Sequence, residues 1–296
     1  MSSLPPTEGR HAASRGLDQL PTAELVDLII RDQSDAVAAV RAQSATIARA
    51  VDAIAKRVRD GGRLHYVGAG TSGRLGVLDA SEMPPTFGVS PDLVCAHIAG
   101  GEDALRRAIE GAEDDASAGD EQMRGHVRKG DAVVGISASG GAAYVVAALQ
   151  RARAIGAFTV AITSVDASAL VRVADEAIVA PTGAEIVAGS TRLKAGTAQK
   201  IALNAISTAV MVRLGKVYDN LMVDMVAANE KLRGRALRLV RDLTDSSEES
   251  ARRALEESGG RVKVAVVMLL RGIEAPAARA LLDANGGALR DVLALP

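Results

Sequence analysis

The residues best suited to chemistry lie in a short glycine-rich stretch, VGAGTSGRLG, that begins at Val67. An apolar run precedes it and a helical pattern follows it, so the stretch is typical of a strand, a tight turn and a helix start. Glycines let the backbone come close to a ligand, and the first N–H groups of a helix point at a bound anion. Thr71 and Ser72 add hydroxyl donors at the tip of the turn. The stretch therefore predicts a phosphate cradle.

The same glycines, Gly68, Gly70 and Gly73, also satisfy the dinucleotide fingerprint G-x-G-x-x-G. That fingerprint expects an acidic residue roughly 20 residues later, at the end of the next strand, to hold the ribose. The next apolar run, at 93–98, ends in AGG, and Glu102 follows where a helix is expected to begin. Two adjacent hydroxyls also suit a terminal phosphate monoester better than a bridging pyrophosphate. We favour the monoester.

A second loop repeats this design after the apolar run at 131–136. Ser137 and Ser139 stand beside Gly140 and Gly141, and a helical pattern follows. Alone, the loop could be an ordinary turn with a serine N-cap. Two such loops at one sheet edge favour a shared anion instead. No Ser-His-acid hydrolase is indicated, because Ser139 stands where a nucleophile elbow needs its second glycine.

Alternating strands and helices must position these loops. Apolar runs predict strands at 63–68, 93–98, 131–136, 158–163 and 176–180, and helices at 73–80, 102–109, 117–127, 142–155 and 193–213. We also expect a short and then a long helix between residues 18 and 60. This is the α/β pattern of a doubly wound parallel sheet covered by helices on both faces. Ligands of such sheets lie beyond the carboxyl ends of the strands.

The strand pattern stops after residue 216. A helix is expected at 218–243, and four short helical patterns separated by glycine or proline follow from Ser246. We predict a flexible N-terminus at 1–17, an α/β domain with N-terminal helices at 18–243, and a small all-helical domain at 244–296.

Composition excludes several classes of function. The chain has 296 residues, a net charge of −1 and no basic block, so nucleic acid is not an expected partner. The sequence has no run of 18 consecutive apolar residues, so no membrane-spanning helix is predicted. The single cysteine, Cys95, rules out a disulfide within the chain, and the N-terminus lacks a hydrophobic signal core. We expect a cytoplasmic protein.

Metal chemistry is not indicated either. The four histidines, at positions 11, 65, 97 and 126, lack ligand spacing, and there is no cysteine cluster. His65 and His97 lie on expected strands, where a hydrogen-bonded core histidine is the simpler role. Acid–base chemistry would then rest on carboxylates or lysine. Glu82, before Pro84-Pro85, and Glu113, in a small-residue break, are candidates, although surface acids are the simpler interpretation.

Three segments carry a resemblance to a known family: GAGTSGRLGVLDASEMPPTFG, IAGGEDALRRAIEGAEDD and GAEIVAGSTRLKAGTAQK. In this order they closely resemble the N-acetylmuramic acid 6-phosphate etherases of bacterial cell-wall recycling, from about residue 18 to the C-terminus. The family core is a sugar isomerase (SIS) domain that binds phosphosugars. The third segment also matches the glucokinase regulatory protein, a relative without catalysis. Met83 departs from the family, which most often has cysteine there.

The resemblance implies an etherase that releases D-lactate from N-acetylmuramic acid 6-phosphate by elimination and then hydration. It implies Glu82 as proton donor to the lactate oxygen and Glu113 as base at carbon 2. By the same resemblance Ser72, Ser137 and Ser139 should hold the 6-phosphate, with Thr71 nearby. Lys194 is a weaker candidate for a substrate contact, because a lysine at a helix start is more often solvated.

The resemblance also implies no metal or other cofactor, a homodimer whose neighbouring subunit completes the sugar pocket, and a C-terminal helical domain of ubiquitin-associated type. The alternative is a phosphosugar-binding regulator without catalysis. Regulators of that class carry two SIS units, whereas this chain has room for one. A phosphosugar aldose–ketose isomerase would share the fold but not the STRLKAGTAQK segment.

Overall fold

The computed structural model describes residues 6–225 and 230–295, which divide into two compact units. The first, here called the sheet unit, comprises Met1–Ala80 and Asp92–Ser207. The second, the helical unit, comprises Ser81–Pro91 and Thr208–Pro296. The domain boundary expected between residues 243 and 244 lies within the helical unit and stays a prediction.

The flexible N-terminus expected at 1–17 lies partly outside the described residues, at 1–5. Residues 6–19 contain three short 3-10 turns, η1 (Pro6–Glu8), η2 (Ala12–Ser14) and η3 (Leu17–Gln19). His11 accepts a hydrogen bond from the backbone N–H of Ala13 and so caps η2. Its other ring nitrogen lies 3.2 Å from a carboxylate oxygen of Asp32, which ties these turns to the first α-helix.

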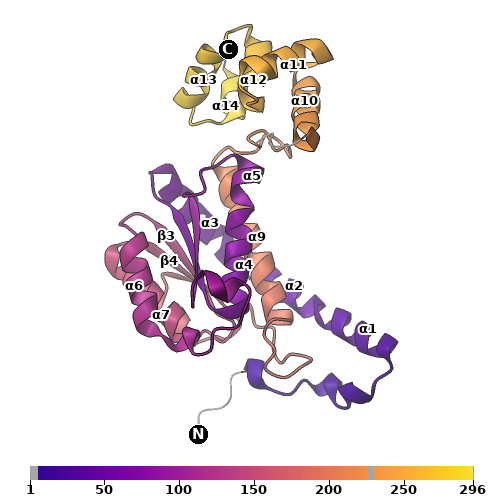
Figure 1. The fold of residues 1–296 in the computed structure, drawn as a ribbon, viewed down its shortest axis with the longest axis vertical. Coiled ribbons are helices and arrows are strands. Elements are labelled where there is room, and N and C mark those ends of the chain that lie inside the picture. The colour runs from indigo at the N-terminus through magenta and orange to yellow at the C-terminus, as the bar shows by residue number, and fades with distance from the viewer. Residues whose placement is uncertain (1–5, 226–229, 296) are drawn as a thin grey trace. The chain divides into compact units, whose positions relative to one another are not determined.

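A parallel sheet of five strands forms the centre of the sheet unit (Figure 1). Its strands are β1 (Leu64–Gly68), β2 (Val94–Ile98), β3 (Ala132–Ile136), β4 (Phe158–Thr163) and β5 (Glu176–Val179), in the order β2-β1-β3-β4-β5. β1 and β3 are buried along their whole length, as expected of central strands covered on both faces. The predicted fold class is confirmed, and each strand lies within one residue of its predicted range.

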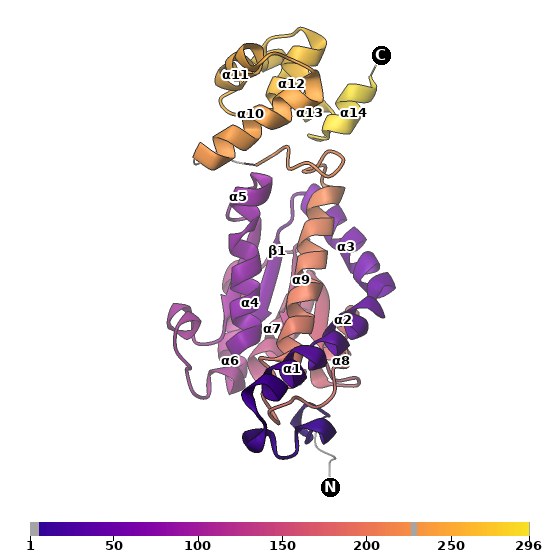
Figure 2. The same cartoon turned by 90° about the vertical axis from the view of Figure 1, so that its right-hand side faces the viewer.

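Helices cover both faces of this sheet. One face carries α3 (Ser44–Arg59), α4 (Gly70–Ser81) and α9 (Lys194–Arg213); the other carries α6 (Ala116–His126), α7 (Ala143–Ile155) and α8 (Ala169–Val173) (Figures 1 and 2). Side chains alternate between the faces. Tyr66 of β1 points to α4, where a Cβ on Gly76 would lie 3.0 Å from it. Val67 packs with Met123 and Val145 of the opposite face.

The N-terminal region forms three α-helices, not the short helix and long helix expected. They are α1 (Thr22–Asp32), α2 (Ser34–Arg41) and α3. The same local contact marks both breaks, because the hydroxyl of Ser34 donates to Arg31 O at 2.8 Å and that of Ser44 donates to Arg41 O at 2.7 Å. Serine hydroxyls that bond the preceding turn compete with the regular helical ladder. Helical spacing of apolar residues does not reveal such breaks.

The prediction of a helix at 102–109 is wrong. Only a 3-10 turn, η4 (Glu102–Leu105), forms there, after Gly100 and Gly101, whose φ angles are positive (84° and 69°). The side chain of Ile109 closes over Gly100, where an added Cβ would lie 3.0 Å from it. Ile109, one of the apolar residues of the predicted helix, therefore covers the glycine turn instead.

Helices make up the helical unit. It contains α5 (Met83–Phe87), α10 (Glu230–Thr244), α11 (Glu248–Glu257), α12 (Val262–Arg271), α13 (Ala275–Ala284) and α14 (Leu289–Ala294). The apolar α12 is the centre, since seven of its ten residues are buried and it packs against α10, α11, α13 and α14. The four predicted C-terminal helices are confirmed. Nowhere in the described residues is a helix both long and apolar enough to cross a membrane.

The helix predicted at 218–243 begins later than expected. Tyr218 and Leu221 form an isolated antiparallel bridge, and helix α10 starts at Glu230. Residues 226–229 of the predicted range lie outside the described residues.

Candidate active site

The first glycine loop, residues 68–73, joins β1 to α4 in a very tight turn. A Cβ on Gly68 would lie 2.6 Å from the backbone nitrogen of Gly73, and a Cβ on Gly73 would lie 2.6 Å from the side chain of Ile98. Only glycine fits these two positions without moving the backbone. The turn sets the first residues of α4 at the carboxyl end of β1, where the first N–H groups of a helix have no intrahelical partner. This geometry suits an anion.

Ser72 lies in the first turn of α4 and is almost fully buried. Its hydroxyl donates a 2.9 Å hydrogen bond to the side-chain oxygen of Gln199, in the second turn of α9. Thr71 is half-buried beside the same helix, since a Cβ on Gly196 would lie 3.6 Å from its methyl group. The first loop is therefore supported by α9, from a segment far along the chain.

The second loop, residues 137–141, begins beside the first, because Gly68 and Ile136 are paired at the ends of β1 and β3. Here the serine side chains form hydrogen bonds within the loop itself. The hydroxyl oxygen of Ser137 accepts from the N–H of Gly140 at 3.1 Å, and that of Ser139 accepts from the N–H of Gly141 at 3.2 Å. Acceptor hydroxyls keep their hydrogen for another partner. The two loops thus meet at one edge of the sheet, as predicted.

Lys194 is the first residue of α9 and is only 1% exposed, so the solvated role considered for it is wrong. Its ammonium group lies 2.8 Å from a carboxylate oxygen of Asp32 and 3.5 Å from one of Asp35. The backbone N–H groups of Lys194 and Ala195 both donate to the buried carboxylate of Glu185, at 3.0 and 2.9 Å. Glu185 caps α9, and Lys194 fastens α1 and α2 to it.

Glu113 lies in the 3-10 turn η5 (Ala112–Asp114), and its side chain is exposed. Gly111, in a left-handed conformation (φ 72°), starts the turn. Ala112 packs against the apolar core beneath α6 and α7, so it fixes the backbone next to Glu113. This anchors a carboxylate that is free to meet a ligand.

Glu82 lies in the helical unit, so the two candidate carboxylates belong to different units. It is the exposed residue between the end of α4 and the start of α5. Pro84 falls in the first turn of α5, where no backbone N–H is needed. Pro84 therefore does not interrupt α5, and the break between α4 and α5 falls at Glu82 itself.

The C-terminus of α5 is held closely within the helical unit. Gly88 adopts a left-handed conformation (φ 62°), and a Cβ there would lie 2.1 Å from the backbone oxygen of Asp224. The Asp224 carboxylate in turn lies 2.6 Å from the ammonium of Lys263 on α12. Lys263 also donates to Gly215 O and Gly287 O, at 2.7 and 2.5 Å. Burial lowers the pKa of Lys263, and Asp224 opposes that shift.

Comparison with known proteins decides the family. An N-acetylmuramic acid 6-phosphate etherase of Symbiobacterium thermophilum is 56% identical over 267 residues, covering 90% of this chain and 89% of the relative. One of Escherichia coli is 47% identical over 288 residues, covering 97% of each. The chain belongs to the N-acetylmuramic acid 6-phosphate etherase family.

Domain and fold comparisons agree with this family. Residues 46–153 match the glucokinase regulatory protein N-terminal SIS domain, and residues 113–209 match the SIS domain. A solved phosphoheptose isomerase from Francisella tularensis aligns with a TM-score of 0.50 at 16% identity, over 66% of this chain and 98% of that one. At that identity the likeness supports the fold alone. The resemblance noted in the sequence is confirmed.

Two polar residues beside the candidate site were not singled out from the sequence. Gln199 and Glu185 both lie in the segment GAEIVAGSTRLKAGTAQK, which carried part of the resemblance. Gln199 bonds Ser72, and Glu185 caps α9. The buried state of Glu185, at 0% exposure, depends on a fold that brings two backbone donors to it. Inspection of every polar residue in that segment could have found them.

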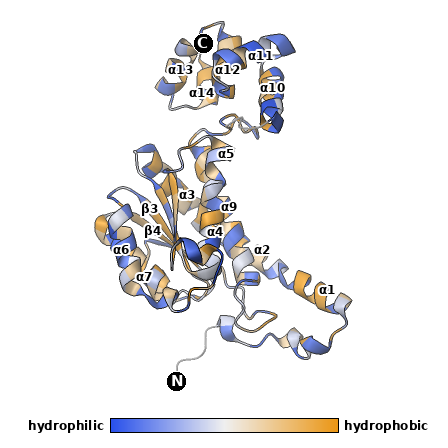
Figure 3. Ribbon diagram, viewed as in Figure 1, coloured by the Kyte–Doolittle hydropathy of each residue, from blue (hydrophilic) through white to orange (hydrophobic). Residues whose placement is uncertain are grey.

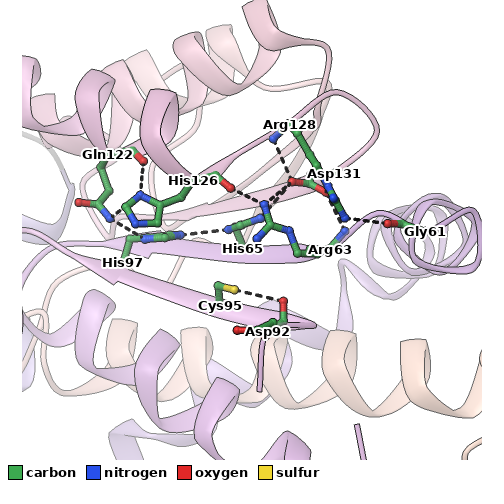
Figure 4. Close-up of polar contacts among 10 residues, drawn as sticks. All are labelled: Gly61, Arg63, His65, Asp92, Cys95, His97, Gln122, His126, Arg128 and Asp131. Atoms are coloured by element: carbon green, nitrogen blue, oxygen red, sulfur yellow. Dashed lines mark hydrogen bonds and ion pairs between the residues drawn. The ribbon is translucent and has the colours of Figure 1, made fainter. Parts of the chain in front are cut away.

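A second polar region of this family member lies between the sheet and α6 (Figure 4). It consists of Asp131, His65, His97 and Gln122, here called the histidine cluster. Gln122 donates to His97 Nδ1 at 2.9 Å, His97 Nε2 lies 3.0 Å from His65 Nδ1, and His65 Nε2 lies 3.2 Å from an Asp131 oxygen. The prediction of hydrogen-bonded core histidines is confirmed.

This chain of bonds requires both histidines to be neutral. If Gln122 donates to His97, then His97 donates to His65 and His65 donates to Asp131, with one hydrogen on each ring. Burial, the largest cause, lowers the pKa of His65 to about 4 and that of His97 to about 3. Burial alone would raise the pKa of Asp131, but backbone donors from Arg128 and Arg63 lower it overall. No group of three possible metal ligands occurs among the described residues.

Proposed function

We propose that this chain cleaves the D-lactyl ether of N-acetylmuramic acid 6-phosphate, giving N-acetylglucosamine 6-phosphate and D-lactate. One observation carries the proposal: relatives 45–56% identical, over 90–98% of this chain, bear the etherase name. The paired hydroxyl loops at the carboxyl edge of the sheet support it, because they suit a phosphate monoester. The direct test is incubation with N-acetylmuramic acid 6-phosphate and an assay for D-lactate. If none is released, the proposal fails.

The proposed reaction needs two proton transfers and a water molecule. In the ring-opened aldehyde form the carbon 2 proton is acidic. A base removes it, the bond from carbon 3 to the lactate oxygen breaks, and an acid protonates that oxygen. Water then adds to the resulting enal, with its hydroxyl on carbon 3 and a proton returned to carbon 2. This proposal uses carboxylates for acid–base catalysis and no metal or other cofactor.

We assign the steps by family resemblance. Glu113 is the proposed base at carbon 2, and Glu82 is the proposed donor to the lactate oxygen. One carboxylate must start ionised and the other protonated, a division that differing environments can produce. Both side chains are exposed in the described chain, which leaves them accessible to a substrate.

The phosphate contacts form a separate part of the proposal. Thr71, Ser72, Ser137 and Ser139 hold the 6-phosphate, supported by their position on two loops that start side by side. Lys194 is kept as a weaker candidate for a substrate contact. Its ammonium is already paired with Asp32, which favours a role in holding the N-terminal helices.

Isotope exchange separates the two carboxylates. Glu113→Gln should lose both lactate release and exchange of the carbon 2 proton in deuterated water. Glu82→Gln should lose lactate release but still exchange that proton of N-acetylglucosamine 6-phosphate, whose open-chain aldehyde has the same acidic position. We expect losses of about 10²–10⁴-fold or more in lactate release. Glu110→Gln, an exposed acid nearby, is the matched control. Exchange lost in Glu82→Gln but kept in Glu113→Gln would reverse the assignment.

The alternative function is a phosphosugar-binding regulator without catalysis. Its specific support is the match of residues 46–153 to the glucokinase regulatory protein domain. A regulator would bind the phosphosugar yet release no lactate, and both glutamate variants would bind as the wild type does. Family membership favours the etherase.

We propose that the chain works as a homodimer. Hydrophobic residues occur along α1 and α2 (Figure 3). On α1, Val26 and Ile30 have 48% and 65% of their surface exposed, and on α2 Val37 has 55% exposed. A second copy would cover these side chains, with an obligate interface above about 2,000 Å² in total. Sedimentation at micromolar concentration should give a dimer, and Ile30→Asp should weaken it. A fully active wild-type monomer would refute the proposal.

The cytoplasmic location is also kept as a proposal. It is supported by the single cysteine, Cys95, which is free, because small-thiol buffers keep cytosolic cysteines reduced. Detection of the chain with a compartment marker after cell fractionation tests it.

A further inference from the structure

Gln199 has an unusual hydrogen-bonding state for a buried amide. Its side chain is 2% exposed and its oxygen accepts from the Ser72 hydroxyl at 2.9 Å. Its side-chain nitrogen is buried and has no hydrogen-bond partner among the described residues. Buried polar atoms are nearly always paired in folded proteins, so an unpaired amide N–H next to a binding loop needs an explanation.

The observed bond also points the Ser72 hydrogen in the wrong direction for phosphate binding. A serine hydroxyl has one hydrogen, and here it is donated to Gln199. A phosphate monoester at neutral pH offers acceptor oxygens, so a phosphate ligand needs that same hydrogen. The second loop has no such conflict, because Ser137 and Ser139 accept bonds from backbone N–H groups and keep their hydrogens.

We propose that Gln199 is a positioning residue that directs the Ser72 hydroxyl toward the 6-phosphate. When phosphate binds, the carboxamide turns over, so that its nitrogen donates to the Ser72 oxygen and Ser72 donates its hydrogen to the phosphate. The turn exchanges two groups of nearly equal size and requires no movement of α9. This inference rests on the proposed phosphate role of Ser72, and Gln199 itself does not touch the ligand.

Two substitutions of Gln199 separate orientation from packing. In Gln199→Glu the new side chain has nearly the same shape but, when ionised, can only accept, so it holds the Ser72 hydrogen away from the phosphate. Gln199→Met fills similar space and leaves Ser72 free to turn. The matched control is Gln150→Glu, the same change at an exposed position of α7.

The experiment measures binding of N-acetylglucosamine 6-phosphate and of inorganic phosphate by titration calorimetry. Ser72→Ala and Gln199→Glu should each weaken binding about 10- to 150-fold, the usual worth of a hydrogen bond to a charged group. Gln199→Met should weaken it less, and should add no further loss to Ser72→Ala. The difference in binding affinity between Gln199→Glu and the wild type should become smaller at acidic pH, where a protonated carboxyl can donate to Ser72.

Each other outcome overturns the inference. Equal losses in Gln199→Glu and Gln199→Met, present also in the Ser72→Ala background and matched by lower melting temperatures, would indicate packing alone. A full additional loss from Gln199→Met in that background would indicate direct contact with the ligand. No loss in any Gln199 variant would remove its role altogether. If Gln199→Glu does not fold, the affinities of Gln199→Met in the wild-type and Ser72→Ala backgrounds still test the inference.

The two proposals can fail separately. A wild-type chain that binds the phosphosugar without releasing lactate contradicts the etherase but leaves the Gln199 test intact. A chain that releases lactate while its Gln199 variants bind normally contradicts only the Gln199 inference.

Discussion

The histidine cluster and the two glycine loops are both polar regions of the sheet unit, yet they use their hydrogen-bonding groups differently. In the cluster, all four ring nitrogens of His65 and His97 have partners, and Asp131 accepts from the backbone of Arg63 and Arg128 as well as from His65 (Figure 4). In the second glycine loop, by contrast, the hydroxyls of Ser137 and Ser139 accept hydrogen bonds and keep their own hydrogens to donate.

The difference separates structural from functional polarity. A closed set of bonds gains nothing from a ligand and stabilises only the fold, whereas spare donors at a sheet edge can bind one. Substitutions in the cluster should therefore change stability alone, and substitutions in the loops should change affinity alone.

The largest effect is expected from Asp131→Ala. It removes a fully buried carboxylate and leaves the N–H groups of Arg63, Arg128 and His65 without their acceptor. We expect a loss of about 3–5 kcal/mol in the free energy of unfolding, measured with urea. The fraction that remains folded should bind N-acetylglucosamine 6-phosphate as the wild type does.

Asp120→Ala is the matched control for that variant. Asp120 also pairs with two arginines, Arg124 and Arg151, but at the surface of the unit. Its removal should cost far less stability, because water replaces the lost partner. Comparable losses in the free energy of unfolding for the two variants would mean that the histidine cluster stabilises the fold no more than a surface ion pair does.

The second glycine loop should give the opposite result. Ser137→Ala and Ser139→Ala each remove one proposed donor to the phosphate, worth roughly 1.5–3 kcal/mol of binding free energy. Stability should hardly change, since the N–H of Gly140 also bonds the backbone oxygen of Ser137 and Gly141 is exposed to water. In lactate release KM should rise more than kcat falls, because a remote phosphate is bound equally in ground and transition states. Variants with unchanged affinity would remove the second loop from the binding site.

Local sequence patterns predicted the sheet and the place of the candidate site. Runs of apolar residues marked all five strands, because strands buried on both faces carry near-continuous apolar sequence. Glycine and serine marked the two loops, since tight turns and helix starts demand these residue types. Carboxyl ends of neighbouring parallel strands share an edge, so the meeting of the loops also followed.

Contacts between distant residues could not be predicted in this way. Ser72 and Gln199 are 127 positions apart, and His65 and Asp131 are 66 apart. No periodicity links such pairs, because they meet only once the helices have packed. The wrong prediction of a helix at 102–109 has a related cause, because two glycines with positive φ and the packing of Ile109 outweigh the helical spacing of the apolar residues.

The smallest effect, taken for one histidine and one pH unit, is a dependence of stability on pH that arises from the histidine cluster. Unfolded histidines take up protons near pH 6.5, while the folded pKa values of His65 and His97 are about 4 and about 3. The cluster's contribution is therefore complete above pH 6.5 and is lost as the pH falls toward those values. Each histidine should account for about 1.4 kcal/mol of unfolding free energy per pH unit.

The variant His97→Gln removes the contribution of His97 to this pH dependence and leaves that of His65. Glutamine can accept from Gln122 and donate to His65 but stays neutral at every pH. Between pH 6.5 and 5, above the range in which most carboxylates titrate, the stability of this variant should fall less steeply than that of the wild type, by about 1.4 kcal/mol per pH unit. Urea unfolding at a series of pH values measures both slopes. Equal slopes would mean that His97 is already charged in the folded chain, which the one-hydrogen-per-ring bonding of the cluster forbids.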